Sequence, residues 1–489
     1  MILIENLKKW KKEREWENAF YLRKGEERVS VTYGQWISDL CCLACRLMER
    51  GIQNKNIAIV LPNCYEWFVA FYGIILSGNV AVPVNRELGN VELERIFDQM
   101  NIHTIFTNSA GMMETGEIVC QERHVENLSK WLSEERKGLR KTEERIEWLE
   151  DQGRIPEDDA TAFMLLSSGT SGISKGVMLS LNNLFSMHGD FPWKEKLNIF
   201  LVSLPLHHVA AVQLTLMFLA RGTILAICES AKYLIRDLLF FRPQIMSVVP
   251  LQLDFIAGRV QKGREEAEIL REHTKYILSL GAPLMDEHEE VFSKINVAVL
   301  NTYGLTEVTG AITEWFPHRK GSIGRVSRVN AYKLEMGEIA IKGPSVMKGY
   351  YRNDKETAKI LRNGWLYTGD IAREDEEGFL YLTGRKKNTI ILSNGENVSP
   401  EELEQRAVRC PLITEIIIFA RDSVIQAEIY LKEDDQKNRE IVEAYIAEMN
   451  ETMPLYRQIR RVFFRKTPFE KTGSGKIKRF LLEQENEKD

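Results

Sequence analysis

Residues Thr161-Ala-Phe-Met-Leu-Leu-Ser-Ser-Gly-Thr-Ser-Gly-Ile-Ser-Lys-Gly-Val-Met-Leu179 pass from an apolar run into glycines and hydroxyls and back into an apolar run. The apolar flanks predict two buried strands, and the three glycines between them permit backbone shapes that a Cβ would forbid. Backbone N–H groups freed in this way can turn toward an anion. Lys175 adds a positive charge, and further donors come from the hydroxyls of Ser167, Ser168, Thr170 and Ser171. The stretch therefore predicts a polyphosphate-binding loop.

This loop differs from a Walker A motif, which has the pattern Gly-x-x-x-x-Gly-Lys-Ser/Thr. Here Lys175 lies three residues past Gly172, and Gly176 follows it. A Gly/Ser turn between two strands is more often a plain hairpin loop. The lysine and the density of hydroxyls favour phosphate binding over that alternative.

Length and charge limit the classes of protein to which the chain can belong. A chain of 489 residues exceeds one ordinary domain, so we expect two or three domains. The formal net charge of −5 gives no reason to expect a nucleic-acid partner. No apolar run reaches 18 residues, so we expect no transmembrane span. The first residues soon become charged at Lys8-Lys9-Trp-Lys-Lys-Glu-Arg14, which favours a cytoplasmic protein without a signal peptide.

Seven cysteines are irregularly spaced, at positions 41, 42, 45, 64, 120, 228 and 410. A metal site is a weak interpretation, because no second cluster completes four ligands. We expect buried free thiols instead.

Short apolar runs alternate with amphipathic stretches, and this alternation predicts an α/β fold with parallel strands and helical crossovers. Residues 129–151 are heavily charged and are interpreted as a solvated helix or linker. Residues 337–350 are interpreted as a hairpin of a separate β-rich subdomain. The last hundred residues, from about 389, predict a small α+β domain.

Several predicted strands end in residues suited to a pocket. The run Leu201-Val-Ser-Leu-Pro-Leu-His-His208 suits a pocket wall, although a hydrogen-bonded histidine at a strand end is equally plausible. Strand 276–280 runs into Gly281 and Ala282, whose small size lets a flat ring come close.

The hexapeptide Thr302-Tyr-Gly-Leu-Thr-Glu307 follows the predicted strand 297–301. Open α/β sheets bind ligands at this carboxyl edge. Tyr303 can stack on a base, Thr306 can donate to a phosphate, and Glu307 offers a hard oxygen to Mg²⁺. The alternative is a capping turn, since Thr-Glu often opens a helix.

Two later segments carry charged groups beside glycines. Asp370 follows a glycine turn in Tyr367-Thr-Gly-Asp370 and could accept ribose hydroxyls, although Gly-Asp is also an ordinary turn pair. The tail Lys471-Thr-Gly-Ser-Gly-Lys-Ile-Lys-Arg479 would by itself be interpreted as a solvated charge run.

The order and spacing of these motifs resemble the adenylate-forming superfamily of acyl- and aryl-CoA synthetases, luciferases and peptide-synthetase adenylation domains. The resemblance covers about residues 30 to 480 and looks closest to bacterial long-chain acyl-CoA synthetases. The matching segments are Ser167–Gly176, Pro205–His208, Tyr303–Glu307, Gly337–Tyr350, Tyr367–Asp370, Gly384–Pro400 and Thr472–Lys476.

The resemblance implies a large N-terminal domain (1–387) of parallel α/β sheets with a small β-barrel-like subdomain, and a small mobile α+β C-terminal domain (388–489). It also implies a two-step reaction with ATP, Mg²⁺ and coenzyme A. A carboxylate first forms acyl-AMP with release of pyrophosphate, and a thiol then displaces AMP. The family hinge would lie near Asn388, where relatives usually carry a charged residue.

The resemblance also assigns roles to individual residues. The catalytic residues would be Lys476, Thr306, Glu307 and His208, with Glu307 as the metal ligand. Ser168 to Lys175 would hold the β- and γ-phosphates, Gly281, Ala282 and Tyr303 would enclose adenine, and Asp370 and Arg385 would fix the ribose. The implied nucleotide- and CoA-binding set is completed by Ser167, Ser168, Gly169, Thr170, Ser171, Gly172, Asn301, Gly304, Gly395 and Glu396.

The acid itself is predicted only by class. His208-Val-Ala-Ala-Val212 would line the pocket without a charge, so we expect an apolar acid and predict a fatty acid, with an aryl or other small carboxylic acid as the alternative. Two further alternatives remain: an acyl-AMP ligase that loads an acyl carrier protein, and a nucleotide-binding module without catalysis. We expect a monomer or homodimer.

Overall fold

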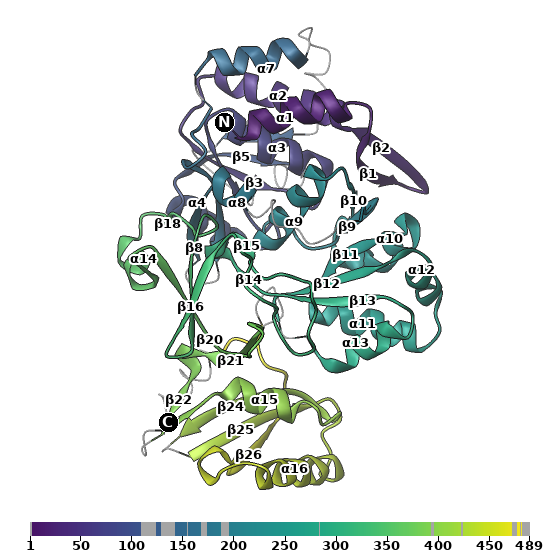
Figure 1. Cartoon of the computed structure of the whole chain (residues 1–489), viewed down its shortest axis with the longest axis vertical. Coiled ribbons are helices and arrows are strands. Elements are labelled where there is room, and N and C mark those ends of the chain that lie inside the picture. The colour runs from purple at the N-terminus through teal and green to yellow at the C-terminus, as the bar shows by residue number, and fades with distance from the viewer. Residues whose placement is uncertain are drawn as a thin grey trace. The chain divides into compact units, whose positions relative to one another are not determined.

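The computed structural model describes residues 2–108, 124–128, 142–153, 155–167, 174–186, 195–282, 284–392, 396–421, 424–471, 477–479 and 481. The chain forms two compact units (Figure 1). The first combines Met1–Ala331 with Ile341–Leu366, and the second combines Tyr332–Ala340 with Tyr367–Asp489. The predicted boundary between residues 387 and 388 marks the expected hinge between two mobile domains, and it stays a prediction.

A seven-stranded sheet forms one layer of the first unit, in the order β13-β12-β11-β9-β10-β1-β2. Its neighbours pair in parallel except β1 and β2, which confirms the predicted parallel α/β architecture. The strands are β1 (Asn18–Lys24), β2 (Glu27–Thr32), β9 (Ile199–Val202), β10 (Ile224–Ile227), β11 (Ile245–Val248), β12 (Tyr276–Leu280) and β13 (Ala298–Thr302).

A second seven-stranded sheet has the order β18-β8-β7-β4-β3-β5-β6. The two strands that flank the glycine loop pair antiparallel, with Ser167 opposite Lys175. The strands are β3 (Asn56–Val60), β4 (Val80–Pro83), β5 (Ile102–Thr107), β6 (His124–Asn127), β7 (Thr161–Ser167), β8 (Lys175–Ser180) and β18 (Gly349–Tyr350).

The hairpin predicted over residues 337–350 is wrong. Strand β18 pairs antiparallel with β8, with Tyr350 opposite Val177, whereas β17 (Glu338–Lys342) belongs to a different sheet. Two short apolar runs that are close in sequence can form a hairpin, but either can also pair with a distant strand whose edge is unpaired. Here β18 pairs with the edge of β8.

Helices cover both sheets. Those on one face of the first sheet share a hydrophobic core with its strands (Figure 1). These are α10 (Leu234–Phe241), α11 (Pro250–Gln261), α12 (Glu265–His273) and α13 (Asp286–Ser293). On the second sheet, α4 (Asn90–Gln99) contributes Leu93, Ile96 and Phe97 to a separate core.

Helix α3 (Tyr65–Leu76) lies between the two sheets. The ring of Phe68 lies 5.0 Å from that of Phe20 on β1, and the ring of Phe71 lies 5.3 Å from that of Phe163 on β7. A helix buried on both sides needs an apolar surface all round, which explains why almost every residue of α3 is apolar. Helices α2 (Tyr33–Glu49), α8 (Leu181–Ser186) and α9 (Val209–Ala220) belong to the same unit.

Two helices rich in charged residues each bury an apolar stripe. Helix α1 (Ile2–Arg14) buries Leu3, Ile4, Leu7 and Trp10, which share one helical face. Helix α7 (Thr142–Asp151) buries Ile146 and Leu149. The sequence predicts a solvated helix or linker over residues 129–151, and residues 129–141 of that segment lie outside the described residues. The helix is seen over Thr142–Asp151, but it is not solvated at Ile146 and Leu149, because apolar residues three apart form a stripe that packs inward.

The second unit contains the predicted small α+β domain. Strands β24 (Ile413–Arg421), β25 (Val424–Leu431) and β26 (Arg461–Arg465) form a sheet whose core is shared with α15 (Pro400–Ala407) and α16 (Gln436–Glu451). Helix α15 begins at Pro400, with Ser399 as its N-cap. Strand β20 (Trp365–Glu374), which lies in this unit from Tyr367 onward, pairs antiparallel with β21 (Leu380–Arg385).

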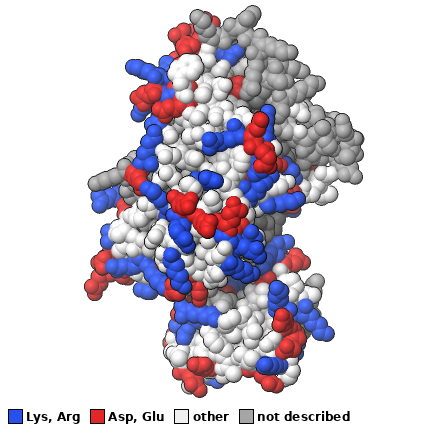
Figure 2. All heavy atoms as spheres, turned by 90° about the vertical axis from the view of Figure 1, so that its right-hand side faces the viewer, with Lys and Arg blue, Asp and Glu red and all other residues white. Residues whose placement is uncertain are grey.

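The remaining short elements are β14 (Gly304–Leu305), β15 (Gly310–Ala311), β16 (Ala331–Glu335), α14 (Asp354–Ile360), β19 (Leu361–Arg362), β22 (Ile390–Ile391) and β23 (Asn397–Val398). Within the described parts of the chain, no helix combines the length and apolar character that crossing a bilayer requires. On the face drawn in Figure 2, basic and acidic side chains are interspersed. Cys41, Cys45, Cys228 and Cys410 are buried and form no disulfide.

Candidate active site

The carboxyl ends of β12 and β13 place three predicted ring-binding residues at one edge of the sheet. Leu280 pairs with Thr302, so Gly281 and Ala282 leave one strand beside Tyr303, which leaves the other. Gly281 has a φ of +88°, and no heavy atom lies within 4 Å of the position that a Cβ would occupy. Tyr303 is buried. The edge therefore combines an open backbone with an aromatic side chain held in place.

Gly304 has a steric reason for lacking a side chain. Strand β14 pairs with β15 so closely that a Cβ on Gly304 would lie 1.8 Å from the carbonyl oxygen of Gly310. On the preceding strand, the Asn301 amide donates to the Ser322 carbonyl at 3.2 Å. Both residues shape the backbone around Tyr303, and a direct contact of either with nucleotide stays a prediction.

Glu307 lies in a single 3₁₀ turn, Thr306–Val308, rather than at the start of a longer helix. The Tyr350 hydroxyl donates to Glu307 Oε1 at 2.8 Å, and the Met347 N–H donates to the Glu307 carbonyl at 2.9 Å. Burial first and the negative charge of Glu307 second raise the pKa of Tyr350. The phenol therefore stays protonated and acts as donor.

The turn after Glu307 holds a backbone conformation that is unusual for a β-branched residue. Thr309 has a φ of 61°, in the left-handed region, which is strained for threonine. Its hydroxyl donates to the Ser345 carbonyl at 2.6 Å, and its N–H donates to the Thr306 carbonyl at 3.1 Å. Strain of this kind persists where surrounding contacts fix it, and it clusters at functional sites.

Lys175 begins β8, directly opposite Ser167. Its Nζ lies 2.7 Å from Glu356 Oε2 and 4.9 Å from the centroid of the Tyr350 ring. The next residue, Gly176, has no space for a side chain, since a Cβ would lie 2.5 Å from the Met100 sulfur. The lysine predicted to bind phosphate is thus held at the end of a strand by an acid and an aromatic ring.

Some predicted site residues lie outside the described parts of the chain and stay predictions. They are Ser168, Gly169, Thr170, Ser171, Gly172, Gly395 and Lys476. Glu396 is described, and its carbonyl accepts from the Leu392 N–H at 3.0 Å.

The two residues predicted to bind ribose belong to the second unit and contact each other. Asp370 on β20 pairs with Arg385 on β21, and Asp370 Oδ1 lies 2.7 Å from Arg385 Nε. Asp370 is buried, at 4% exposure. In the segment that follows, the Asn388 amide donates to Glu401 on the first turn of α15. The structure shows that Asp370 and Arg385 contact each other. Their binding of ribose stays a prediction.

His208 is exposed and occupies the N-cap position of α9. Burial lowers the pKa of the neighbouring His207 to about 3, with His208 acting in the same direction. The segment is anchored by buried Asn63. Its amide donates to the Leu204 carbonyl at 2.9 Å and accepts from the Leu206 N–H at 3.0 Å. These hydrogen bonds hold the backbone between Leu204 and Leu206 in place. A catalytic role for His208 stays a prediction.

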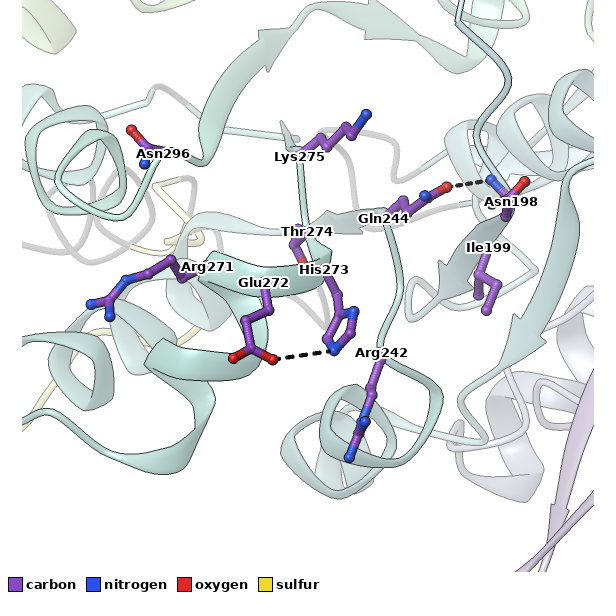
Figure 3. A pocket seen from close by; sticks show the side chains of 10 residues that line it. All are labelled: Asn198, Ile199, Arg242, Gln244, Arg271, Glu272, His273, Thr274, Lys275 and Asn296. Carbon is purple, nitrogen blue, oxygen red and sulfur yellow. Dashed lines mark hydrogen bonds and ion pairs between the residues drawn. The ribbon is translucent and has the colours of Figure 1, made fainter.

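A polar pocket of about 300 Å³ lies at the opposite edge of the first sheet (Figure 3). Ile199 begins β9, while Gln244 and Lys275 directly precede β11 and β12, so the pocket opens at the amino ends of these strands. Arg242 and Arg271 also line it, and their side chains point in different directions in Figure 3. This pocket is separate from the edge that carries Tyr303.

Four residues that hold the site together have no role predicted from the sequence: Asn63, Gln213, Tyr350 and Glu356. Gln213 is the only amide in helix α9, whose other residues are apolar apart from Thr215, and that isolation was a usable signal. Its side chain donates to the Ala311 carbonyl at 3.0 Å and accepts from the Ala311 N–H at 2.7 Å. Tyr350 and Glu356 gave no comparable signal, because their contacts depend on the pairing of β18 with β8.

Comparison with known proteins assigns both parts of the chain to one family. Residues 8–351 match the family model described as AMP-binding enzyme, and residues 387–489 match the model of the AMP-binding enzyme C-terminal domain. A long-chain-fatty-acid–CoA ligase of Bacillus subtilis is 28% identical over an alignment that covers 96% of this chain and 91% of that protein.

Solved structures share the fold. The O-succinylbenzoate coenzyme A synthetase of Bacillus subtilis, in complex with ATP and magnesium ion, aligns with a TM-score of 0.79 and 23% identity, covering 98% of this chain and 99% of that one. An anthranilate CoA ligase in complex with anthranoyl-AMP aligns with a TM-score of 0.82 and 18% identity, covering 99% and 96%. At these identities the likeness establishes the fold.

Proposed function

Because the chain belongs to the family of AMP-binding enzymes, we propose that it is an AMP-forming acid–thiol ligase that activates a fatty acid with ATP and transfers it to coenzyme A. The observation that carries the proposal is the meeting of Lys175 and Glu307 at Tyr350. A cation and a carboxylate from distant segments thereby contact the same tyrosine, as the handling of a polyphosphate with its metal ion requires.

In the first step a substrate carboxylate oxygen attacks the α-phosphorus of ATP, and the bond to pyrophosphate breaks. In the second step a thiolate sulfur attacks the acyl carbon, and AMP leaves with the bonding electrons. The first step brings several negative charges together, so donors and cations must be in place beforehand. Lys175, with the hydroxyls of residues 167–171 and the loop glycines, would bind the β- and γ-phosphates.

The residues around Glu307 fit a magnesium ion. Tyr350 donates to Oε1, and the carboxylate offers the hard oxygen that Mg²⁺ prefers as a ligand. Among the described residues, no group of three or more His, Cys, Asp or Glu could hold a metal ion. Mg²⁺ is usually bound through one or two carboxylates together with waters and substrate phosphates, so Glu307 would be its ligand from this edge. When bound there, Mg²⁺ would neutralise charge on the phosphates.

The remaining roles follow the family resemblance. Gly281, Ala282 and Tyr303 would enclose adenine, Asp370 and Arg385 would bind ribose, and Lys476 would neutralise charge between the carboxylate and the α-phosphate. Thr306 would donate to phosphate, with Asn301 and Gly304 shaping the same edge. The C-terminal part from residue 388 would reorient between the steps and bring Gly395 and Glu396 toward the thiol. A cytoplasmic monomer or homodimer completes the proposal.

A fatty acid is supported by two observations. The first turn of α9 after His208 consists of Val209, Ala210, Ala211 and Val212, which offer no charge to a substrate. In addition, the relative from Bacillus subtilis that spans nearly the whole chain is named a long-chain-fatty-acid–CoA ligase. An apolar wall suits an alkyl chain and gives no partner to a second carboxylate.

Pyrophosphate release tests the proposal. The purified protein is supplied with MgATP and, in separate reactions, saturated acids of C4 to C18, aromatic acids and succinylbenzoate. Release with fatty acids, followed by thioester formation only when CoA is added, is the expected result. Turnover confined to aromatic acids or diacids overturns the substrate class. Transfer to an acyl carrier protein in place of CoA overturns the acceptor, and nucleotide binding without release overturns the enzyme.

A further inference from the structure

Three side chains meet where β8, β18 and α14 come together. Because Tyr350 lies opposite Val177 in the sheet, its ring faces Lys175, two positions earlier on β8. The chain then turns into α14, whose first turn carries Glu356 to within 2.7 Å of the Lys175 ammonium. The lysine therefore contacts both a carboxylate and the face of an aromatic ring.

A short hydrogen-bond network holds this segment rigid. Asn353 is the N-cap of α14, and its side chain accepts from the Glu356 N–H at 3.1 Å. The Thr357 hydroxyl donates to the Asn353 carbonyl at 2.9 Å and accepts from the Tyr350 N–H at 2.9 Å. The backbone positions of Tyr350 and Glu356 are thus fixed relative to each other before any ligand binds.

Glu356 remains an anion at neutral pH. Its hydrogen bond with Lys175 first, and that with Lys359 second, lower the pKa of the carboxyl to about 2. The side chains of Lys175 and Glu356 are 21% and 28% exposed. The contact is therefore partly shielded from solvent, although water still screens it.

The geometry leaves the lysine able to bind phosphate. An ammonium has three N–H donors. One is directed at Glu356, and the positive charge also faces the Tyr350 ring, which attracts a cation without accepting a conventional hydrogen bond. Donor capacity remains for a phosphate oxygen, so Glu356 need not leave before nucleotide binds.

We propose that Glu356 and Tyr350 are positioning residues that fix the Lys175 ammonium for the β- and γ-phosphates of ATP. A lysine side chain has a flexible stem of four methylene groups, and ordering it only when ligand binds costs affinity. Here folding orders the ammonium in advance. This inference rests on the proposed function, in which Lys175 binds those phosphates.

The test compares the binding of ATP and AMP, measured by isothermal titration calorimetry in the presence of Mg²⁺ and without a carboxylic acid. Glu356→Gln keeps the size of the side chain and removes its charge. We expect its Kd for ATP to rise about threefold to fivefold, the range for a partly exposed ion pair. Its Kd for AMP should stay unchanged, because AMP lacks the phosphates that Lys175 would contact.

Asp354→Asn is the matched control, since Asp354 is an exposed acid on the first turn of the same helix. It should bind both nucleotides like the wild type. Glu356→Ala, checked for folding by circular dichroism, should repeat the loss seen with Glu356→Gln. In a Lys175→Ala background, Glu356→Gln should have no further effect on the Kd for ATP, because the residue acts through the lysine.

Each contrary outcome has a separate meaning. Tighter ATP binding by Glu356→Gln would show that the carboxylate competes with phosphate, and it would overturn the positioning role. Losses that simply add to those of Lys175→Ala, or that extend equally to AMP, would also overturn it. An unchanged Kd for ATP in Lys175→Ala alone would instead remove the lysine from the proposed function.

Discussion

The Tyr350 hydroxyl and the Glu307 carboxylate, 43 positions apart in the chain, share a hydrogen bond of 2.8 Å. Tyr350→Phe removes that bond and keeps the ring that faces Lys175. A hydrogen bond to a charged group contributes about 1.5–3 kcal/mol, so we expect a rise of about 10- to 10²-fold in the Mg²⁺ concentration needed for half-maximal pyrophosphate release. A Mg²⁺ titration at saturating ATP measures this, and an unchanged midpoint would separate Tyr350 from the metal.

Glu307→Gln keeps the shape of the side chain and removes the negative charge that the metal ion requires. We expect adenylation to fall by about 10²-fold, the usual loss for one preorganised electrostatic group. Pyrophosphate release at saturating MgATP is the measurement. Wild-type release would rule out a metal-binding role for Glu307, and Glu314→Gln, on the chain after β15, serves as the comparison.

Lys476→Ala should separate the two half-reactions. In the proposed function the lysine neutralises charge only during adenylation, so acyl-AMP formation should fall by roughly 10²-fold or more. Thioester formation from supplied acyl-AMP and CoA should remain nearly intact. Equal losses in both half-reactions would mean that Lys476 is structural, and the idea of alternating domain positions would lose its main support.

Gly304→Ala should destabilise the protein. The added methyl group would lie 1.8 Å from the Gly310 carbonyl oxygen, and overpacking of this kind costs about 1–3 kcal/mol. Gly258 on α11 is the control, because nothing lies within 4 Å of its Cβ position. Gly258→Ala should be neutral or should stabilise the helix by up to about 1 kcal/mol. Urea unfolding of both variants measures the difference, and equal midpoints would contradict the close approach of β14 and β15.

His207 should make the free energy of unfolding of the wild type decrease more steeply as the pH falls. Burial lowers the pKa of His207 from 6.5 to about 3, so between these values the unfolded chain binds a proton that the folded chain does not. The free energy of unfolding therefore falls as the pH decreases from 7 toward 5. In His207→Gln this loss should be smaller by about 1 kcal/mol. Urea midpoints at both pH values measure it, with exposed His103→Gln as control. Identical pH dependence in wild type and His207→Gln would contradict the lowered pKa.

The sheets and the edge that carries Tyr303 could be predicted because their signals are local. Apolar runs such as Tyr276–Leu280 form strands wherever they are buried, and the residues that follow a parallel strand must lie at its carboxyl edge. The order Gly281-Ala282 and then Tyr303-Gly304 was sufficient to place them at that edge.

The contacts around Lys175 could not be predicted in the same way. They require that Gly349–Tyr350 join the free edge of β8, a pairing between segments more than 160 residues apart. The sequence 337–350 favours a local hairpin equally well, so pattern alone gave the wrong partner. The buried stripe on α7 was hidden for a different reason, since seven charged or polar residues outweigh Ile146 and Leu149 in any average over Thr142–Asp151.

The two hydrogen bonds between Gln213 and Ala311 give a helix side chain the role that a neighbouring strand normally has. They tie α9, whose first turn would contact the acid, to the strand that follows the turn of Glu307. In the proposed function, the choice of acid and the handling of ATP are thus mechanically joined. Redesign of α9 for a bulkier acid should therefore succeed most readily when the position of Gln213 is unchanged. If α9 shifted, its hydrogen bonds to Ala311 would also shift β15 and the neighbouring residues proposed to bind ATP.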